Sequence, residues 1–145
     1  MLRQLERVLG VLSGGVGIGC LLYAVFGPTY VYERYRNGVT SSGTESWLQV
    51  GIGPISVVYL SAMATLFIAV PVLALRHAAK PGGITLAGLW AVTVLLLTGT
   101  IIGAAGIGLI VAAATLAALL TVIVATFAAW ESSGPTPGGR LSSIT

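Results

Sequence analysis

Residues 81–130 constrain this chain most, because these fifty consecutive residues include no Asp, Glu, Lys, Arg, His, Tyr or Cys. A single helix of that length would measure about 75 Å at about 1.5 Å per residue. The hydrocarbon core of a bilayer is only about 30 Å thick. The stretch therefore predicts two membrane-spanning helices that fold back on each other.

The composition of the whole chain supports a membrane domain and excludes an ordinary globular one. The 145 residues are 56% hydrophobic and 8% charged, and the mean hydropathy is +0.99. In a typical soluble domain about a quarter of the residues are charged. The net charge of +3 comes from seven basic and four acidic residues. These are too few and too scattered for a nucleic-acid surface, which needs a clustered basic stripe.

Charges and helix breakers divide residues 1–130 into four predicted spans within a single transmembrane domain. Arg7 precedes the first span, Arg76 follows the second, and glycines 103, 106 and 108 separate the third from the fourth. Each span has about the 20 residues needed to cross a bilayer. The predicted fold class is an all-α membrane protein, a four-transmembrane-helix bundle with spans at 8–27, 54–75, 84–103 and 107–130.

The basic residues that flank the spans predict the orientation, since cytoplasmic loops carry an excess of Lys and Arg. With the N-terminus in the cytoplasm, five basic residues lie inside and two outside. The chain is thus expected in a cell membrane, multi-pass, with both termini cytoplasmic and with loop 28–53 on the outer face. Residues 131–145, rich in Gly, Pro, Ser and Thr, predict a flexible cytoplasmic tail. The inner residues are Arg3, Arg7, Arg76, Lys80 and Arg140, and the outer ones are Arg34 and Arg36.

The outer loop carries a β-hairpin signal. Asn37-Gly38 stands between a Tyr-rich and a Thr/Ser-rich run, and Asn-Gly favours the two-residue type I′ turn. Such a turn would place Tyr35 opposite Thr40 and Glu33 opposite Ser42. An isolated hairpin is marginally stable in water, so one of its faces is expected to rest on the helix ends or on another protein.

Six residues of this loop are of the types favoured at binding hot spots, Tyr, Trp and Arg. They have two interpretations. They cover the outer mouth of the bundle and anchor the membrane interface, as Tyr and Trp commonly do, or they bind a protein partner. The partner-binding candidates are Tyr30, Tyr32, Arg34, Tyr35, Arg36 and Trp47.

Glycines at helical spacing predict close helix packing, because small residues let helix backbones approach each other in lipid. One set lines a side of the first span, and two GxxxG pairs lie in the first and third spans. The pattern favours packing within the bundle and leaves oligomerisation as the alternative. The helix-packing candidates are Gly10, Gly14, Gly15, Gly17, Gly19, Gly99 and Gly103.

The predicted spans contain no ionisable group of the kind on which membrane chemistry usually depends. The acids Glu6, Glu33, Glu45 and Glu131 are placed in flanks or loops, and His77 is expected to be solvated at the end of the second span. Haem and metal sites need several ligands. The sequence therefore predicts no catalytic residue, no metal, no cofactor and no enzyme activity.

The layout, four spans with a β-containing first outer loop, resembles that of claudin-like proteins. The paired cysteines and the tryptophan-glycine-leucine-tryptophan signature of that family's first loop are missing, so the resemblance implies layout and no function. The sequence favours a non-catalytic accessory or scaffold subunit in contact with lipids. It would dock a protein partner or further copies of itself through its small-residue helix faces and its Tyr/Arg-rich outer hairpin. The alternative is a small oligomeric transporter or channel for an uncharged or small solute, lined by Ser and Thr hydroxyls.

Overall fold

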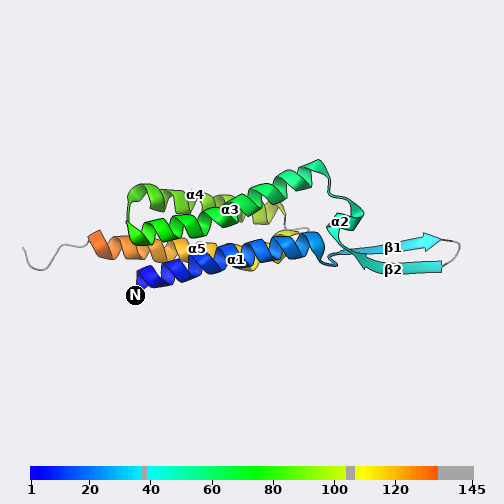
Figure 1. Cartoon of the computed structure of the whole chain (residues 1–145), viewed down its shortest axis with the longest axis horizontal. Helices are drawn as coiled ribbons and strands as arrows, with labels where there is room; N and C mark the ends of the chain where they lie inside the picture. The colour runs from blue at the N-terminus through cyan, green and yellow to red at the C-terminus, as the bar shows by residue number, and fades with distance from the viewer. Residues whose placement is uncertain (37–38, 104–106, 134–145) are drawn as a thin grey trace, which may run out of the picture.

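The structure is a computed structural model that describes residues 1–36, 39–103 and 107–133. Four long helices lie side by side in an elongated bundle, and a two-stranded hairpin extends from one end (Figure 1). Each helix is long and apolar enough to cross a membrane. This confirms the predicted fold class, and it is the architecture of a small integral membrane protein. The helices are α1 (Leu2–Phe26), α3 (Pro54–Ala79), α4 (Gly83–Ile102) and α5 (Ile107–Ser133).

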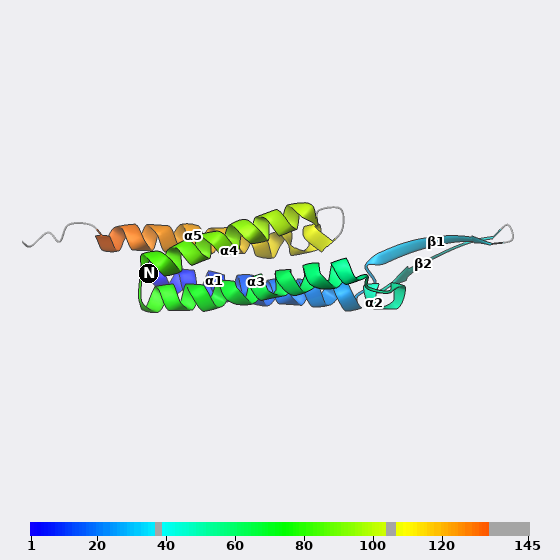
Figure 2. The ribbon, with the colours of Figure 1, turned by 90° about the horizontal axis from the view of Figure 1, so that it is seen from above.

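The helices form two layers, with α1 and α3 in one and α4 and α5 in the other (Figure 2). Along the chain the four long helices run in alternating directions (Figure 1). α1 packs most extensively against α5 and then against α3. A buried hydrogen bond joins α1 to α5, because the Ser13 hydroxyl donates to the Ala114 carbonyl at 2.9 Å. Lipid is as apolar as a protein core, so this close packing and bonding, rather than hydrophobic burial, holds the helices together.

Three helices extend further than the sequence predicted. α5 continues to Ser133, so residues 131–133 are helical and do not belong to a flexible tail. α1 begins at Leu2 rather than at residue 8, and α3 continues to Ala79 rather than ending at residue 75. The prediction ended the spans of α1 and α3 at the first charge, but Arg is a good helix former and its long side chain reaches the interface from inside a helix. Arg7 and Arg76 therefore lie within helices. Pro81 and the glycines after it then separate α3 from α4.

Three glycines of α1 allow α3 to approach closely. A Cβ atom at Gly14 would lie 2.8 Å from both the Phe67 carbonyl oxygen and Pro71 Cγ, and one at Gly10 would lie 2.6 Å from Ala74 Cβ. A Cβ atom at Gly17 would clash with the Phe67 ring. Only a residue without a side chain fits at these positions.

The other predicted packing glycines divide into two groups. Gly99 lies against Met63 and Gly103 against Tyr59, so both bring α4 close to α3. At Gly15 and Gly19 a Cβ atom would have no neighbouring atom within 4 Å, so these two glycines point out of the bundle. A role of Gly15 and Gly19 in contacts between copies of the chain stays a prediction.

The hairpin consists of β1 (Tyr30–Arg36) and β2 (Val39–Glu45), paired antiparallel. Tyr35 lies opposite Thr40 and Glu33 opposite Ser42, as predicted. The Asn37-Gly38 turn lies outside the described residues, as do residues 104–106 of the predicted α4–α5 turn and residues 134–145 of the predicted tail.

A short helix, α2 (Trp47–Val50), connects the hairpin to α3. Ser46 caps it, because its hydroxyl accepts from the Gln49 N–H at 3.3 Å while the Gln49 side chain accepts from the Ser46 N–H at 2.8 Å. Gly51 follows with a φ of 99°, a left-handed conformation that favours glycine. The chain thereby turns into α3, which begins with Pro54.

Candidate functional site

The hairpin projects along the long axis of the molecule, beyond the end of the helices (Figures 1 and 2). Its two strands pack chiefly against each other, and neither strand packs extensively against a long helix. Of the two supports that the sequence left open, the helix ends do not cover the hairpin faces. The hairpin is therefore a two-stranded ribbon open to its surroundings.

One face of this ribbon is well described and exposed. Alternation along β1 places Val31, Glu33 and Tyr35 on the same face, opposite three hydroxyl residues of β2, Thr44, Ser42 and Thr40. Val31 is 71% and Tyr35 is 77% exposed. We call these six residues the open face. It presents an aromatic ring, an aliphatic side chain and hydroxyls, which suit a contact that is partly apolar and partly hydrogen-bonded.

The six partner-binding candidates do not form one surface. Tyr35 belongs to the open face, whereas Tyr30, Tyr32, Arg34 and Arg36 occupy the alternate positions of β1. Tyr32 is half-buried and its hydroxyl lies close to Gly43, the residue opposite it, so the ring covers the gap that glycine leaves in β2. The side chains of Tyr30, Arg34 and Arg36 lie outside what the structure describes.

Trp47 lies apart from the hairpin, in α2. It is half-buried and packs against the hydrophobic core at the hairpin end of the bundle. It also lines an open pocket of about 280 Å³ with Ile55, Tyr59 and Ile102. Tyr59 itself is engaged, since its hydroxyl donates to the Gly99 carbonyl at 2.9 Å. Trp47 therefore anchors the hairpin to the helices and does not contribute to the open face.

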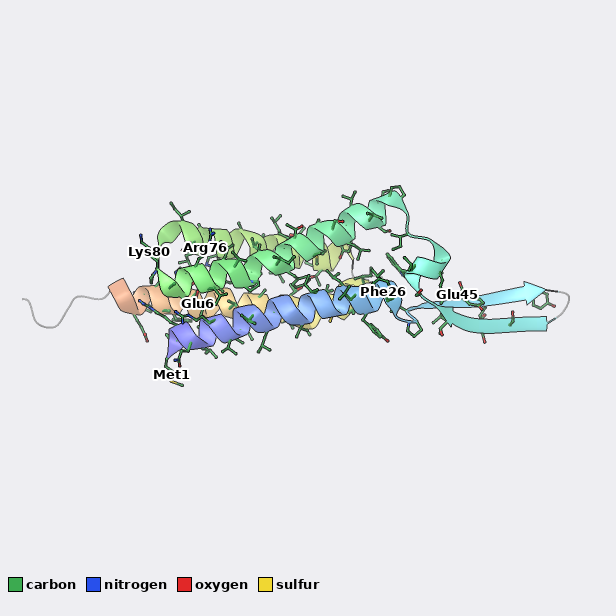
Figure 3. The ribbon with its side chains drawn as sticks, viewed as in Figure 1. Met1, Glu6, Phe26, Glu45, Arg76 and Lys80 are labelled. Carbon is green, nitrogen blue, oxygen red and sulfur yellow. The ribbon has the colours of Figure 1, made fainter. Side chains whose placement is uncertain are left out.

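A second site lies at the opposite end of the bundle, and the sequence prediction was wrong about it. Glu6 was placed in a flank and His77 was expected to be solvated. Glu6 is in fact 0% exposed within α1, and His77 is 2% exposed within α3. Glu6 Oε1 lies 2.8 Å from His77 Nδ1, so a buried acid and a buried imidazole are hydrogen-bonded to each other. Figure 3 shows Glu6 at the end that carries Met1, Arg76 and Lys80.

The packing of α1 against α3 explains why these two side chains meet. The helices run antiparallel, and Gly10 lies against Ala74. Glu6 is one turn before Gly10 and His77 is one turn after Ala74, so the next contact along the two helices joins Glu6 to His77. The small residues that bring the backbones together thus also set the distance between the Glu6 and His77 side chains.

A signal for this pair exists in the sequence. Glu6 continues the spacing of Gly10, Gly14 and Gly17, which marks the packing face of α1. His77 continues the buried positions of α3, which are Met63, Phe67, Val70 and Ala74. Extending each small or apolar stripe by one turn would have placed both ionisable groups inside the bundle.

The pair is incompletely satisfied within the described part of the chain. Glu6 Oε2 and His77 Nε2 are buried and have no hydrogen-bond partner there. Arg7 is exposed, and its guanidinium donates to the Ala78 carbonyl at 3.4 Å. An ionisable group inside a membrane bundle is expensive to bury and commonly marks a functional site.

Most of the threonine hydroxyls that were considered as a possible solute path are bonded within the bundle, whereas Thr93 Oγ1 is buried without a hydrogen-bond partner in the described part of the chain. Five threonines donate to the carbonyl four residues earlier in their own helix, the usual way in which a helix satisfies such a group. Thr100 and Thr115 also share a hydrogen bond of 2.8 Å between α4 and α5. The five are Thr65, Thr98, Thr115, Thr121 and Thr126.

Comparisons of this chain with models of protein families, with curated proteins and with solved structures gave no significant match.

Proposed function

We propose that this small integral membrane protein is a non-catalytic accessory or scaffold subunit, which docks a protein partner through its hairpin. The observation that carries the proposal is the open face, held beyond the end of the helices with Val31 and Tyr35 exposed. A two-stranded hairpin is marginally stable on its own. A partner that covers the open face would supply the packing contacts that the two-stranded ribbon lacks.

Both strands of the hairpin are also edge strands, which proteins normally protect by Pro, bulges or a covering element. β1 contains no Pro, and its register with β2 is continuous. An extended segment of a partner can add to such an edge through main-chain hydrogen bonds. The alternative of a solute path has less support, because five of the threonine hydroxyls considered for it are bonded to carbonyls of their own helices.

The docking proposal predicts that Tyr35→Ser weakens partner binding by about 30-fold, the effect of losing a hot spot worth about 2 kcal/mol. The partner is identified by native mass spectrometry of the gently solubilised complex, and a photo-crosslinker at residue 35 shows that it touches the open face. Binding to the full-length chain in nanodiscs then gives the affinity.

Tyr23→Ser is the matched control, because Tyr23 is 57% exposed on α1, outside the hairpin. It is expected to bind the partner as the unaltered chain does. Equal binding by the Tyr35→Ser and unaltered chains, or a crosslinker at residue 35 that captures only lipid, would contradict the proposal.

Positive flanking residues support an orientation with both termini in the cytoplasm and the hairpin outside. In a Cys20→Ser background, Ser42→Cys is expected to react with a membrane-impermeant maleimide in intact cells. Gln4→Cys is expected to react only after permeabilisation. Both positions are exposed in the structure, so a reversed pattern of labelling would establish the opposite orientation.

A further inference from the structure

We infer that Glu6 and His77 form a proton-binding site, and that uptake of a second proton by the pair separates α1 from α3 at this end of the bundle. The inference is independent of the docking function, because it concerns the opposite end of the molecule. It rests on the 2.8 Å contact, on the burial of both side chains and on the two unpartnered atoms of the pair.

The pair has three states of protonation. With one titratable proton it is a carboxylate beside an imidazolium, and its net charge is zero. Loss of that proton leaves a carboxylate beside a neutral imidazole, with a net charge of −1, and gain of another leaves a carboxylic acid beside an imidazolium, with a net charge of +1. A buried net charge is strongly unfavourable, so the one-proton state is the one that suits the closed bundle.

Of the two states with a net charge, the +1 state is less favourable in the closed bundle than the −1 state, because of where the second proton binds. Glu6 Oε1 already accepts from His77 Nδ1, so the added proton binds Oε2, the oxygen without a partner. The pair would then bury an O–H donor and the imidazolium Nε2–H donor, neither of which has an acceptor in the described chain. An unsatisfied buried donor costs about 1–3 kcal/mol. The −1 state, in contrast, keeps the Nδ1–H donated to a charged carboxylate.

The charges around the pair also disfavour its +1 state. The cations at this end of the described chain are the Met1 amino group, Arg3 and Arg7 on or before α1, and Arg76 and Lys80 on or after α3. Glu131 of α5 is the anion, and α4 contains no charged residue. Positive neighbours oppose a +1 pair and tolerate a −1 pair. The α1–α3 contact is therefore expected to open in acid.

Protons reach the site from one side only. Glu6 lies four residues from the start of α1, or about 6 Å along the helix axis, whereas Phe26 at the other end is about 30 Å away. Residues 8–27, 54–75 and 81–130 contain no Asp, Glu, Lys, Arg or His that would carry a proton across. The site therefore senses the pH on the side of the N-terminus and does not form a path through the membrane.

The proton count can be read directly, because His77 is the only histidine of the chain. NMR of its imidazole nitrogens is recorded on the full chain in nanodiscs from about pH 8 to about pH 4, the range in which His and Glu side chains ordinarily titrate. We expect a protonated Nδ1 throughout and a second change of the imidazole signals in acid, when Glu6 is neutralised. Signals that stay constant over this whole range would overturn the inference.

The separation of the helices is measured between spin labels at Leu5→Cys and Leu75→Cys in a Cys20→Ser background. Both leucines are 45% exposed; Leu5 directly precedes Glu6, and Leu75 lies two residues before His77. The distance between the labels is expected to be longer at the acid end of the range. A distance that is the same at both ends would overturn the inference.

Two variants show whether the pair causes the opening. Glu6→Gln combined with His77→Gln removes both titratable groups while an amide–amide hydrogen bond can replace the original one, and it is expected to abolish the acid response. Glu131→Gln changes the other acid at this end and is expected to preserve it. The inference fails if the double variant opens as the unaltered chain does, or if Glu131→Gln alone abolishes the opening.

Discussion

His77→Ala is expected to lower the free energy of unfolding by about 3–5 kcal/mol, because it leaves the Glu6 carboxylate buried without its partner. Unfolding is followed in mixed micelles with increasing denaturing detergent. Leu75→Ala is the matched control on the same helix, since Leu75 is 45% exposed, and it is expected to cost far less.

A double-mutant cycle separates the interaction from the two side chains. Glu6→Leu together with His77→Leu replaces the pair by apolar groups and is expected to be less destabilising than His77→Ala, since an apolar pair leaves no buried charge. The cycle also includes Glu6→Leu alone and His77→Leu alone. If the losses in unfolding free energy of these two variants add up to that of the double variant, the two side chains are not coupled and the pair does not help to join α1 to α3.

Gly14→Leu is expected to have the second large effect, a loss of about 1–3 kcal/mol or more from overpacking. A Cβ atom alone would lie 2.8 Å from the Phe67 carbonyl oxygen, which is backbone and has little freedom to move. The same substitution at the adjacent residue, Gly15→Leu, meets open space. It is expected to be neutral or slightly stabilising, because leucine has the higher helix propensity. Both are measured by the same detergent unfolding.

The different effects expected from the same substitution at two neighbouring positions make this test specific. If Gly15→Leu is as destabilising as Gly14→Leu, the α1–α3 contact is not the one described. If Gly15→Leu instead leaves the unfolding of the single chain unchanged but alters its oligomeric state, Gly15 and Gly19 form a contact between copies.

Most of the fold follows from the sequence because its signals are local. Uncharged stretches of about twenty residues define the spans, and the Asn-Gly signal at residues 37–38 predicts the register in which the described strands pair. The short helix at Trp47 was missed, although the spacing of Ser46 and Gln49 is that of a capping box. Trp47 was therefore grouped with the hairpin residues, whereas it lies in α2, which connects the hairpin to the long helices.

The stripe on each helix can place its own ionisable group on a packing face, but the pairing of Glu6 with His77 could not be read from one helix at a time. Glu6 alone looks like a polar residue before a span, and His77 alone looks like a polar residue after one. Their pairing depends on the register between α1 and α3, which the contact of Gly10 with Ala74 sets. A single sequence shows both stripes of small residues on α1, but it does not show which of them faces α3.

The contact between the first and the last helix has a consequence for the biogenesis of the protein. The Ser13 hydroxyl finds its acceptor at Ala114, and α1 packs more extensively against α5 than against any other helix. During synthesis, which proceeds at about 5–20 residues per second, α1 is made seconds before α5 emerges. The first span therefore resides in the membrane with part of its packing face uncovered, and truncation within the last span would leave it in that state permanently.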